Sequence, residues 1–185
     1  QLTTIITSGK TKMPTKYFSY GSNMSASYLK KFRNVEATWS SVAKLIDYQF
    51  VMNMPGPNFI EPGFGNIVRK KDSYVEGMLH EISDDDFKRI VASEGEDYLI
   101  EDVSIETDSG PQLSKTLIYK SDIKELRTSR RYLRLIVTAA KENNLSVAYI
   151  DELLQKKSVY YPVFSELYSI VIYFWVKSRA RKIIK

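Results

Sequence analysis

The sequence contains no cysteine and a single histidine, His80, among its 185 residues. Without cysteine the chain can form no disulfide and no thiolate metal site, and it has no cysteine nucleophile. One histidine excludes multi-histidine zinc clusters and makes any Ser-His-Asp triad depend on His80 alone, which we interpret as a structural or surface residue. The chemistry must therefore come from carboxylates, tyrosine hydroxyls and backbone amides.

An excess of positive charge is absent from most of the chain, although the net charge is +5. Residues 177–185 hold five basic residues and no acidic one, so residues 1–176 carry 22 basic and 22 acidic residues. A neutral body lacks the electrostatic footprint of a nucleic-acid-binding face. We therefore predict no nucleic-acid partner for the domain.

The first residues, Gln1–Lys16, lack the uninterrupted apolar core of a secretory signal. We predict a loose leader at residues 1–15 and a cytoplasmic location. The overall composition, 43% hydrophobic and 26% charged, is typical of one compact domain. We place that domain at residues 16–157 and a tail at residues 158–185.

Short runs of alternating, β-branched or aromatic residues predict six strands, at Lys16–Tyr20, Ala43–Met52, Asn66–Arg69, Val75–Ile82, Leu99–Thr107 and Lys115–Tyr119. Helix starts are predicted after four capping serines, Ser25, Ser83, Ser129 and Ser146. Many strands followed by helices favour an α+β fold. The stretch rich in proline and glycine between Pro55 and Gly65 is predicted to be a loop, which either borders a site or is an ordinary surface excursion.

Glu94 breaks the pattern of the helix that Ser83 begins. Phe87, Ile90 and Val91 form an apolar stripe whose next member, seven residues after Phe87, is Glu94. Glu94 also precedes Gly95, so it lies in the last turn, where the negative end of the helix disfavours a carboxylate by about 0.3–1 kcal/mol. Such local inconsistency often marks a functional site, although a helix that frays early would leave Glu94 in water.

A tight turn follows the first predicted strand. Gly21, Ser22 and Asn23 come directly after Tyr20 and just before a helix start, so several backbone N–H groups can converge on one point. Such a point attracts a carboxylate or a phosphate. The same residues would also suit an ordinary strand-to-helix turn.

Several segments in this order resemble the gamma-glutamylcyclotransferases. They are Tyr17-Phe18-Ser19-Tyr20-Gly21-Ser22-Asn23-Met24, Gly65-Asn66-Ile67, Val75-Glu76-Gly77-Met78-Leu79, Ser93-Glu94-Gly95, Ser129-Arg130-Arg131-Tyr132 and Ala140-Lys141-Glu142-Asn143-Asn144-Leu145. The resemblance covers about residues 17–156. The Tyr-Gly-Ser-Asn form of the first segment looks like the branch that acts on gamma-glutamyl amino acids.

This resemblance implies a small, mostly antiparallel β-barrel with flanking helices and no metal or organic cofactor. It implies that Glu94 is the catalytic carboxylate and that the substrate is bound by Tyr17, Phe18, Ser19, Tyr20, Gly21, Ser22, Asn23 and Tyr132. Tyr98 is a further candidate for ordering the carbonyl oxygen or Glu94. The implied partner is a small gamma-glutamyl compound, which the enzyme would cyclise to 5-oxoproline with release of an amine.

The tail and the activity each leave alternatives open. Residues 159–176 contain one charged residue, Glu166, and precede the basic segment, so residues 159–185 could make weak membrane contact. We favour instead a helix or strand whose Tyr168, Ile172 and Trp175 pack on the domain or in a homodimer. The alternative to an enzyme is a non-catalytic module of the same fold that binds a carboxylate-bearing ligand, with or without a membrane tether through the tail.

Overall fold

The structure, a computed structural model, describes residues 14–182, except for the side chains of residue 172 and residues 175–182. Residues 1–13 of the predicted leader lie outside the described residues. In chain order the elements are β1 (Thr15–Ser19), η1 (Ser22–Met24), α1 (Ala26–Tyr28), η2 (Leu29–Arg33), β2 (Trp39–Pro55), β3 (Gly63–Ile82), α2 (Asp84–Glu94), β4 (Tyr98–Thr107), β5 (Gly110–Tyr119), β6 (Thr128–Ser129), α3 (Arg130–Glu142), α4 (Val147–Leu154), β7 (Ser158–Val159) and α5 (Phe164–Lys182).

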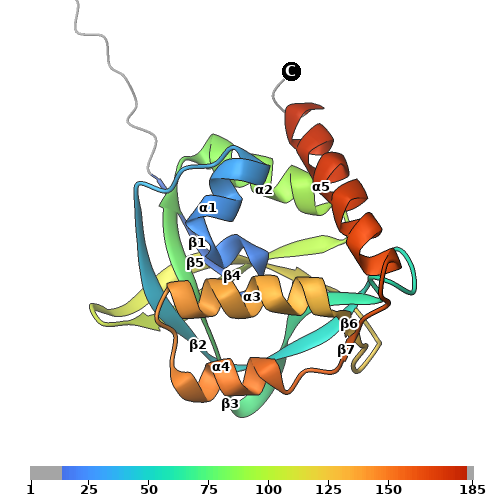
Figure 1. Cartoon of the computed structure of the whole chain (residues 1–185). Helices are drawn as coiled ribbons and strands as arrows, with labels where there is room; N and C mark the ends of the chain where they lie inside the picture. Colours follow the sequence, from blue (N-terminus) through green and yellow to red (C-terminus); the bar gives the residue numbers. More distant parts are fainter. Residues whose placement is uncertain (1–13, 183–185) are drawn as a thin grey trace, which may run out of the picture.

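Five strands form a closed barrel in the order β1-β3-β2-β4-β5 (Figure 1). Neighbouring strands are antiparallel, except where β1 closes the barrel against β5 in a parallel pair. Helices flank the barrel, so the predicted α+β class with a small, mostly antiparallel barrel is confirmed. Closure removes the exposed edges that an open sheet of this size would present.

The strand predictions missed the two-residue strands β6 and β7 and were wrong about β3. Asn66–Arg69 and Val75–Ile82 belong to a single 20-residue strand, β3. Between them the register against β2 slips from Tyr48↔Arg69 to Ile46↔Tyr74. The polar run there favours a loop between two strands in the sequence. In the structure it forms an irregularity inside one strand, because the surrounding pairs hold both halves to β2.

The four serine caps were predicted correctly. The hydroxyls of Ser25, Ser83, Ser129 and Ser146 each accept a hydrogen bond from the backbone N–H three residues later. Such a cap typically contributes about 1 kcal/mol to helix stability. At the other end of α2, Gly95 adopts a φ of 112° and its N–H bonds to the carbonyl of Val91. The helix therefore continues to Glu94 and does not fray before it.

Two apolar clusters position the site. One fills the barrel and extends to α3 and α4, with Phe18, Phe50 and Ile136 among its buried members. The second lies between β1, η2 and α2 and includes Tyr17, Leu29 and Ile90. Burying each such side chain contributes about 1.5–3 kcal/mol, so the second cluster fixes α2 beside β1 and η2.

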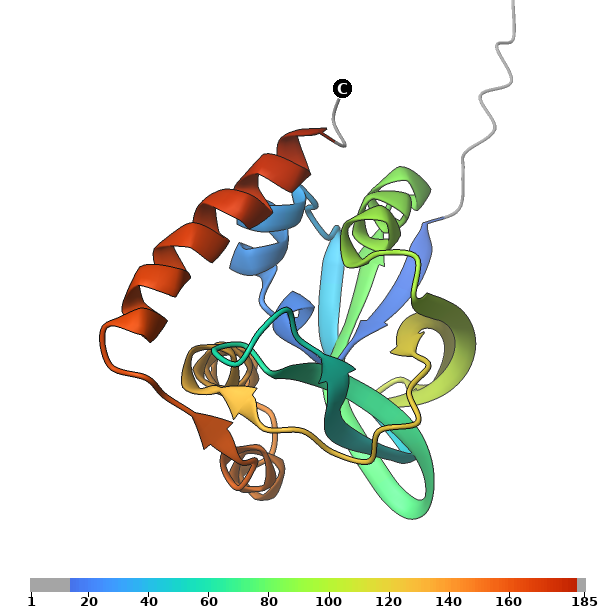
Figure 2. The same cartoon turned by 90° about the vertical axis from the view of Figure 1, so that its right-hand side faces the viewer.

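The tail forms α5, which runs along the outside of the molecule beside η2 (Figure 2). The hydroxyl of Tyr168 accepts a hydrogen bond from Asn58 Nδ2 at 2.9 Å, so this predicted docking residue does contact the domain. The side chains of Ile172 and Trp175 lie outside the described residues. Within the part of the chain that the structure describes, no helix is both long enough and apolar enough to cross a membrane.

Candidate functional site

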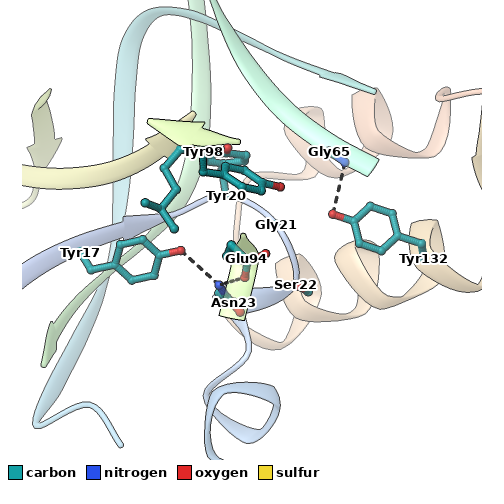
Figure 3. Close-up of a pocket in the computed structure, with 10 residues that line it drawn as sticks. Tyr17, Tyr20, Gly21, Ser22, Asn23, Gly65, Glu94, Tyr98 and Tyr132 are labelled. Atoms are coloured by element: carbon teal, nitrogen blue, oxygen red, sulfur yellow. Dashed lines mark hydrogen bonds between the residues drawn. The ribbon is translucent and has the colours of Figure 1, made fainter. Parts of the chain in front are cut away.

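One pocket gathers most of the predicted site residues (Figure 3). It lies where β1, η1, the end of α2, the start of β4 and the start of α3 meet. The residues that line it are Tyr17, Tyr20, Gly21, Ser22, Asn23, Gly65, Glu94, Tyr98, Leu117 and Tyr132. The fold thus brings Glu94 and the turn after β1 into one site, although they are about seventy residues apart in the sequence.

Phe18 and Ser19 do not reach the pocket. Phe18 is fully buried in the barrel core, because successive residues of a strand point to opposite faces. Ser19 Oγ is buried 3.1 Å from His80 Nε2 and donates to the carbonyl of Met78. The structure therefore gives these two residues packing positions beneath the site.

One oxygen of the Glu94 carboxylate is held by two donors. Glu94 Oε1 accepts hydrogen bonds from Arg33 Nη2 at 2.7 Å and from Asn23 Nδ2 at 3.0 Å. The side chains of Arg33 and Glu94 are only 10% and 19% exposed, so the ion pair is shielded from solvent. Charge-assisted bonds of this length are among the stronger ones in proteins. They fix Oε1 and leave Oε2 as the oxygen available to a ligand.

Asn23 connects Glu94 to the turn and to the barrel. Its amide nitrogen donates to Glu94 and also to the hydroxyl of Tyr17 at 3.2 Å, while its backbone carbonyl accepts from His80 Nε2 at 3.0 Å. Asn23 Oδ1 and Arg33 Nε are buried and have no hydrogen-bond partner among the described residues. Buried polar atoms left unpaired are rare in native proteins and are typical of sites that a ligand or water completes.

The four tyrosines of the pocket are proton donors at neutral pH. Burial raises the pKa of Tyr17, Tyr20, Tyr98 and Tyr132 above the ordinary value of 10.0. Two of the hydroxyls are already engaged, since Tyr20 donates to the carbonyl of Leu117 and Tyr98 donates to Met54 Sδ at 2.7 Å. Tyr17 and Tyr132 instead accept hydrogen bonds, from Asn23 and from the N–H of Gly65, and can still donate their own protons to a ligand.

Arg33 and Gly65 are site residues that sequence reasoning missed. Arg33 follows Lys30 and Lys31 and reads as part of a solvated basic run, and only the fold shows that it turns inward. A Cβ on Gly65 would lie 2.6 Å from the Phe50 ring and 3.3 Å from the Tyr132 hydroxyl. Glycine therefore permits the close approach of Tyr132, and the sequence signal for it was its place in the Gly65-Asn66-Ile67 segment.

His80 is a structural residue, as interpreted from the sequence. It is fully buried in the barrel wall, with Nδ1 2.8 Å from Ser40 Oγ and Nε2 bonded to the carbonyl of Asn23. Burial lowers the pKa of His80 to about 4. The neutral ring therefore supports the Asn23 turn from behind. In the part of the chain that the structure describes, no group of three or more His, Asp or Glu side chains is placed to hold a metal ion.

The depressed pKa of His80 predicts a loss of stability in acid. Between pH 6.5 and about 4 the unfolded chain binds a proton at His80 that the folded chain does not. The stability that neutral His80 contributes is fully present above pH 6.5 and is lost as the pH drops toward 4, by roughly 3 kcal/mol in total. The free energy of unfolding, measured with urea across this pH range, should depend less on pH in His80→Gln than in the unchanged chain. An unchanged pH dependence would contradict the lowered pKa of His80.

Comparisons with known proteins agree with this architecture. Residues 74–153 match the family model described as the AIG2-like family. A gamma-glutamylcyclotransferase of Bos taurus is 25% identical over 143 residues, which cover 74% of this chain and 76% of that protein. The gamma-glutamyl cyclotransferase gliK of Claviceps purpurea is 24% identical over 172 residues, covering 85% and 77%.

The barrel and its helices define the gamma-glutamylcyclotransferase-like fold. A solved gamma-glutamyl cyclotransferase superimposes with a TM-score of 0.70 and covers 80% of this chain and 91% of its own, at 19% identity. The family-model match over residues 74–153, the two relatives and this shared fold together support the gamma-glutamylcyclotransferase family for the chain.

Proposed function

We propose that the protein is a gamma-glutamylcyclotransferase, which converts the gamma-glutamyl group of a gamma-glutamyl amino acid or amine into 5-oxoproline and releases the free amine. The observation that carries the proposal is that Glu94 shares one pocket with the turn at Gly21–Asn23. Two relatives that are named for this activity support the same reaction class. The proposed function includes no nucleic-acid partner.

The reaction needs little from the protein beyond positioning and proton transfer. The α-amine of the gamma-glutamyl group attacks its own γ-carbonyl carbon, a C–N bond forms, and a five-membered lactam closes. The amide C–N bond to the leaving amine then breaks. Holding the substrate folded can supply up to roughly 7–11 kcal/mol of the barrier in favourable cases, because the nucleophile is part of the same molecule.

Glu94 is the proposed proton shuttle. Its Oε2 would accept a proton from the α-ammonium, which frees the amine to attack, and would return that proton to the leaving nitrogen. The second proton that the attacking nitrogen loses on becoming the lactam N–H would also pass to the leaving amine, which departs as an ammonium ion. General acid and base catalysis of this kind typically contributes about 10²–10⁴-fold. Arg33 and Asn23 hold Oε1, so the carboxylate does not have to reorient between the two transfers.

The turn and the tyrosines are proposed to bind the substrate. Backbone N–H groups of Gly21, Ser22 and Asn23 stand at the start of η1, where the first amides of a helix lack partners inside it, and would hold the α-carboxylate. Tyr132 would donate its hydroxyl proton to the γ-carbonyl oxygen, where negative charge develops during ring closure. Tyr98 and Tyr20, whose hydroxyls bond to the protein, would shape the pocket wall.

The pocket is small, which favours a compact head group. Its cavity volume is about 40 Å³. About 10–15 Å³ holds one water, so the cavity has room for only a few polar groups. A gamma-glutamyl end would enter it, while the leaving amine would stay toward the opening.

Incubation with a panel of gamma-glutamyl dipeptides tests the proposal. We expect 5-oxoproline and the free amino acid to appear in equal amounts, with a rate that depends on the leaving amine. A protein that binds the dipeptides and leaves them intact would instead be the non-catalytic module. Release of glutamate in place of 5-oxoproline would contradict cyclisation, because it would show that water is the nucleophile.

A further inference from the structure

Helix α5 leaves most of its described apolar side chains exposed, while the ring of Tyr173 on its inner side packs edge-on against Phe32 of the domain. Ser165, Tyr168 and Ser169 are half-buried on the inner side, where Tyr168 bonds to Asn58. The outer side is between 57% and 67% exposed at Val163, Phe164, Leu167, Ile170, Val171 and Phe174. An ordinary surface helix turns its apolar stripe toward the core, whereas these six apolar residues of α5 and its start remain exposed.

The exposed residues form one continuous face. Their spacing of three or four residues places them on roughly a third of the helix circumference. In Figures 1 and 2, α5 lies at the periphery and no other described element covers its outer side. A contiguous apolar surface of this kind marks an interaction site, whereas scattered single residues would not.

The apolar face continues past the start of the helix. Phe59, in the loop between β2 and β3, is 63% exposed and packs edge-on against Tyr161, with ring centroids 5.3 Å apart. Tyr160 and Tyr161 are themselves 39% and 38% exposed. Aromatic side chains with a polar tip are enriched where a protein meets the boundary between water and lipid.

Positive charge is concentrated at the other end of the same helix. The last six residues of α5 include Lys177, Arg179, Arg181 and Lys182 and no acid, while residues 1–176 carry equal numbers of basic and acidic residues. On η2, Lys31 Nζ lies 4.9 Å from the ring of Tyr173 and adds a further cation beside α5. An apolar face next to a cluster of cations is complementary to an anionic lipid surface.

We propose that α5 and the adjoining Phe59–Tyr161 pair dock the protein on a membrane surface that contains anionic lipid. The helix would lie in the plane of the headgroups, since no described helix is apolar enough to cross. A second copy fits this face less well. In a symmetric antiparallel pair, the four cations of residues 177–182 would lie near the start of the partner's α5, where Glu166 is the single acid of the first turn.

Sedimentation of the full chain with lipid vesicles tests this docking, independently of the proposed activity. The chain should bind vesicles of phosphatidylcholine with phosphatidylserine, bind vesicles of phosphatidylcholine alone only weakly, and dissociate as salt increases. Lys177→Gln combined with Arg181→Gln should weaken binding roughly thirtyfold, because each cation near such a surface contributes about a factor of five.

Leu167→Glu should weaken binding by at least about tenfold. Leu113→Glu is the matched control, because Leu113 is 70% exposed on β5, away from α5, and should bind as the unchanged chain does. Thermal unfolding should show that both variants remain folded. The proposal is overturned if the unchanged chain binds neither kind of vesicle, or if Leu167→Glu binds vesicles as tightly as the unchanged chain. It is also overturned if the chain binds no vesicle but forms a dimer that the Leu167→Glu substitution dissociates.

Discussion

Glu94→Gln is expected to lower kcat for 5-oxoproline formation by about 10²–10⁴-fold. Glutamine keeps the shape of the side chain, and its amide oxygen can still accept from Arg33 and Asn23, which hold Oε1 in the native site. The amide cannot take the proton of an α-ammonium at neutral pH. Steady-state kinetics with one gamma-glutamyl dipeptide should therefore show a large loss in kcat and a small change in KM.

Glu96→Gln is the matched control for this result. Glu96 lies two residues further along the chain, is exposed, and does not line the pocket. Its replacement should leave kcat and KM unchanged. Full activity in Glu94→Gln would show that the proton passes through another group and would remove the basis of the mechanism.

Arg33→Gln is expected to lower both stability and kcat. Removing one partner of a shielded ion pair leaves the Glu94 carboxylate without a compensating cation, at a cost of about 3 kcal/mol in the free energy of unfolding. The carboxylate would then be held by Asn23 alone. Misplacement of a catalytic group by about 1 Å can cost up to about 10²-fold in rate, so we expect the loss in kcat with little change in KM.

Two further variants distinguish a role of Arg33 in positioning Glu94 from a role in stability alone. Arg33→Lys should recover part of kcat, because an ammonium can still pair with Glu94 Oε1, although without the geometry of the guanidinium. Lys30→Gln removes a neighbouring ion pair, with Glu36, whose side chains are 69% and 76% exposed, and should change neither quantity measurably. A destabilised Arg33→Gln that retains full kcat would show that Arg33 serves the fold alone.

Much of the fold could be predicted because its signals are local. The serine caps act on amides three residues away, and the alternation of strand residues reports which face is buried. Glu94 could be singled out for the same reason, since it interrupts the stripe of its own helix. The barrel class came from the family resemblance, which depended on segments such as Tyr17–Met24.

The remaining features depend on contacts between distant residues. The pairing of Arg33 with Glu94 joins residues 61 positions apart, and a basic run by itself does not show which member turns inward. The continuity of β3 is maintained by β2 on both sides of the register slip, which residues 70–73 do not reveal. Strand alternation sends Phe18 to the face opposite Tyr17, into the barrel core. Ser19 shares the face of Tyr17, but its hydroxyl is taken up by the Met78 carbonyl and lies beside His80, a contact between residues distant in the sequence.

The fate of the α-nitrogen tests the central claim most directly. A gamma-glutamyl dipeptide that carries a heavy-nitrogen label in the α-amine of its glutamyl group would be turned over and the products analysed by mass spectrometry. The account predicts that the label is retained in the ring of 5-oxoproline and that the unlabelled amino acid is released. Labelled free glutamate, or a dipeptide that stays intact in the presence of the folded protein, would contradict it.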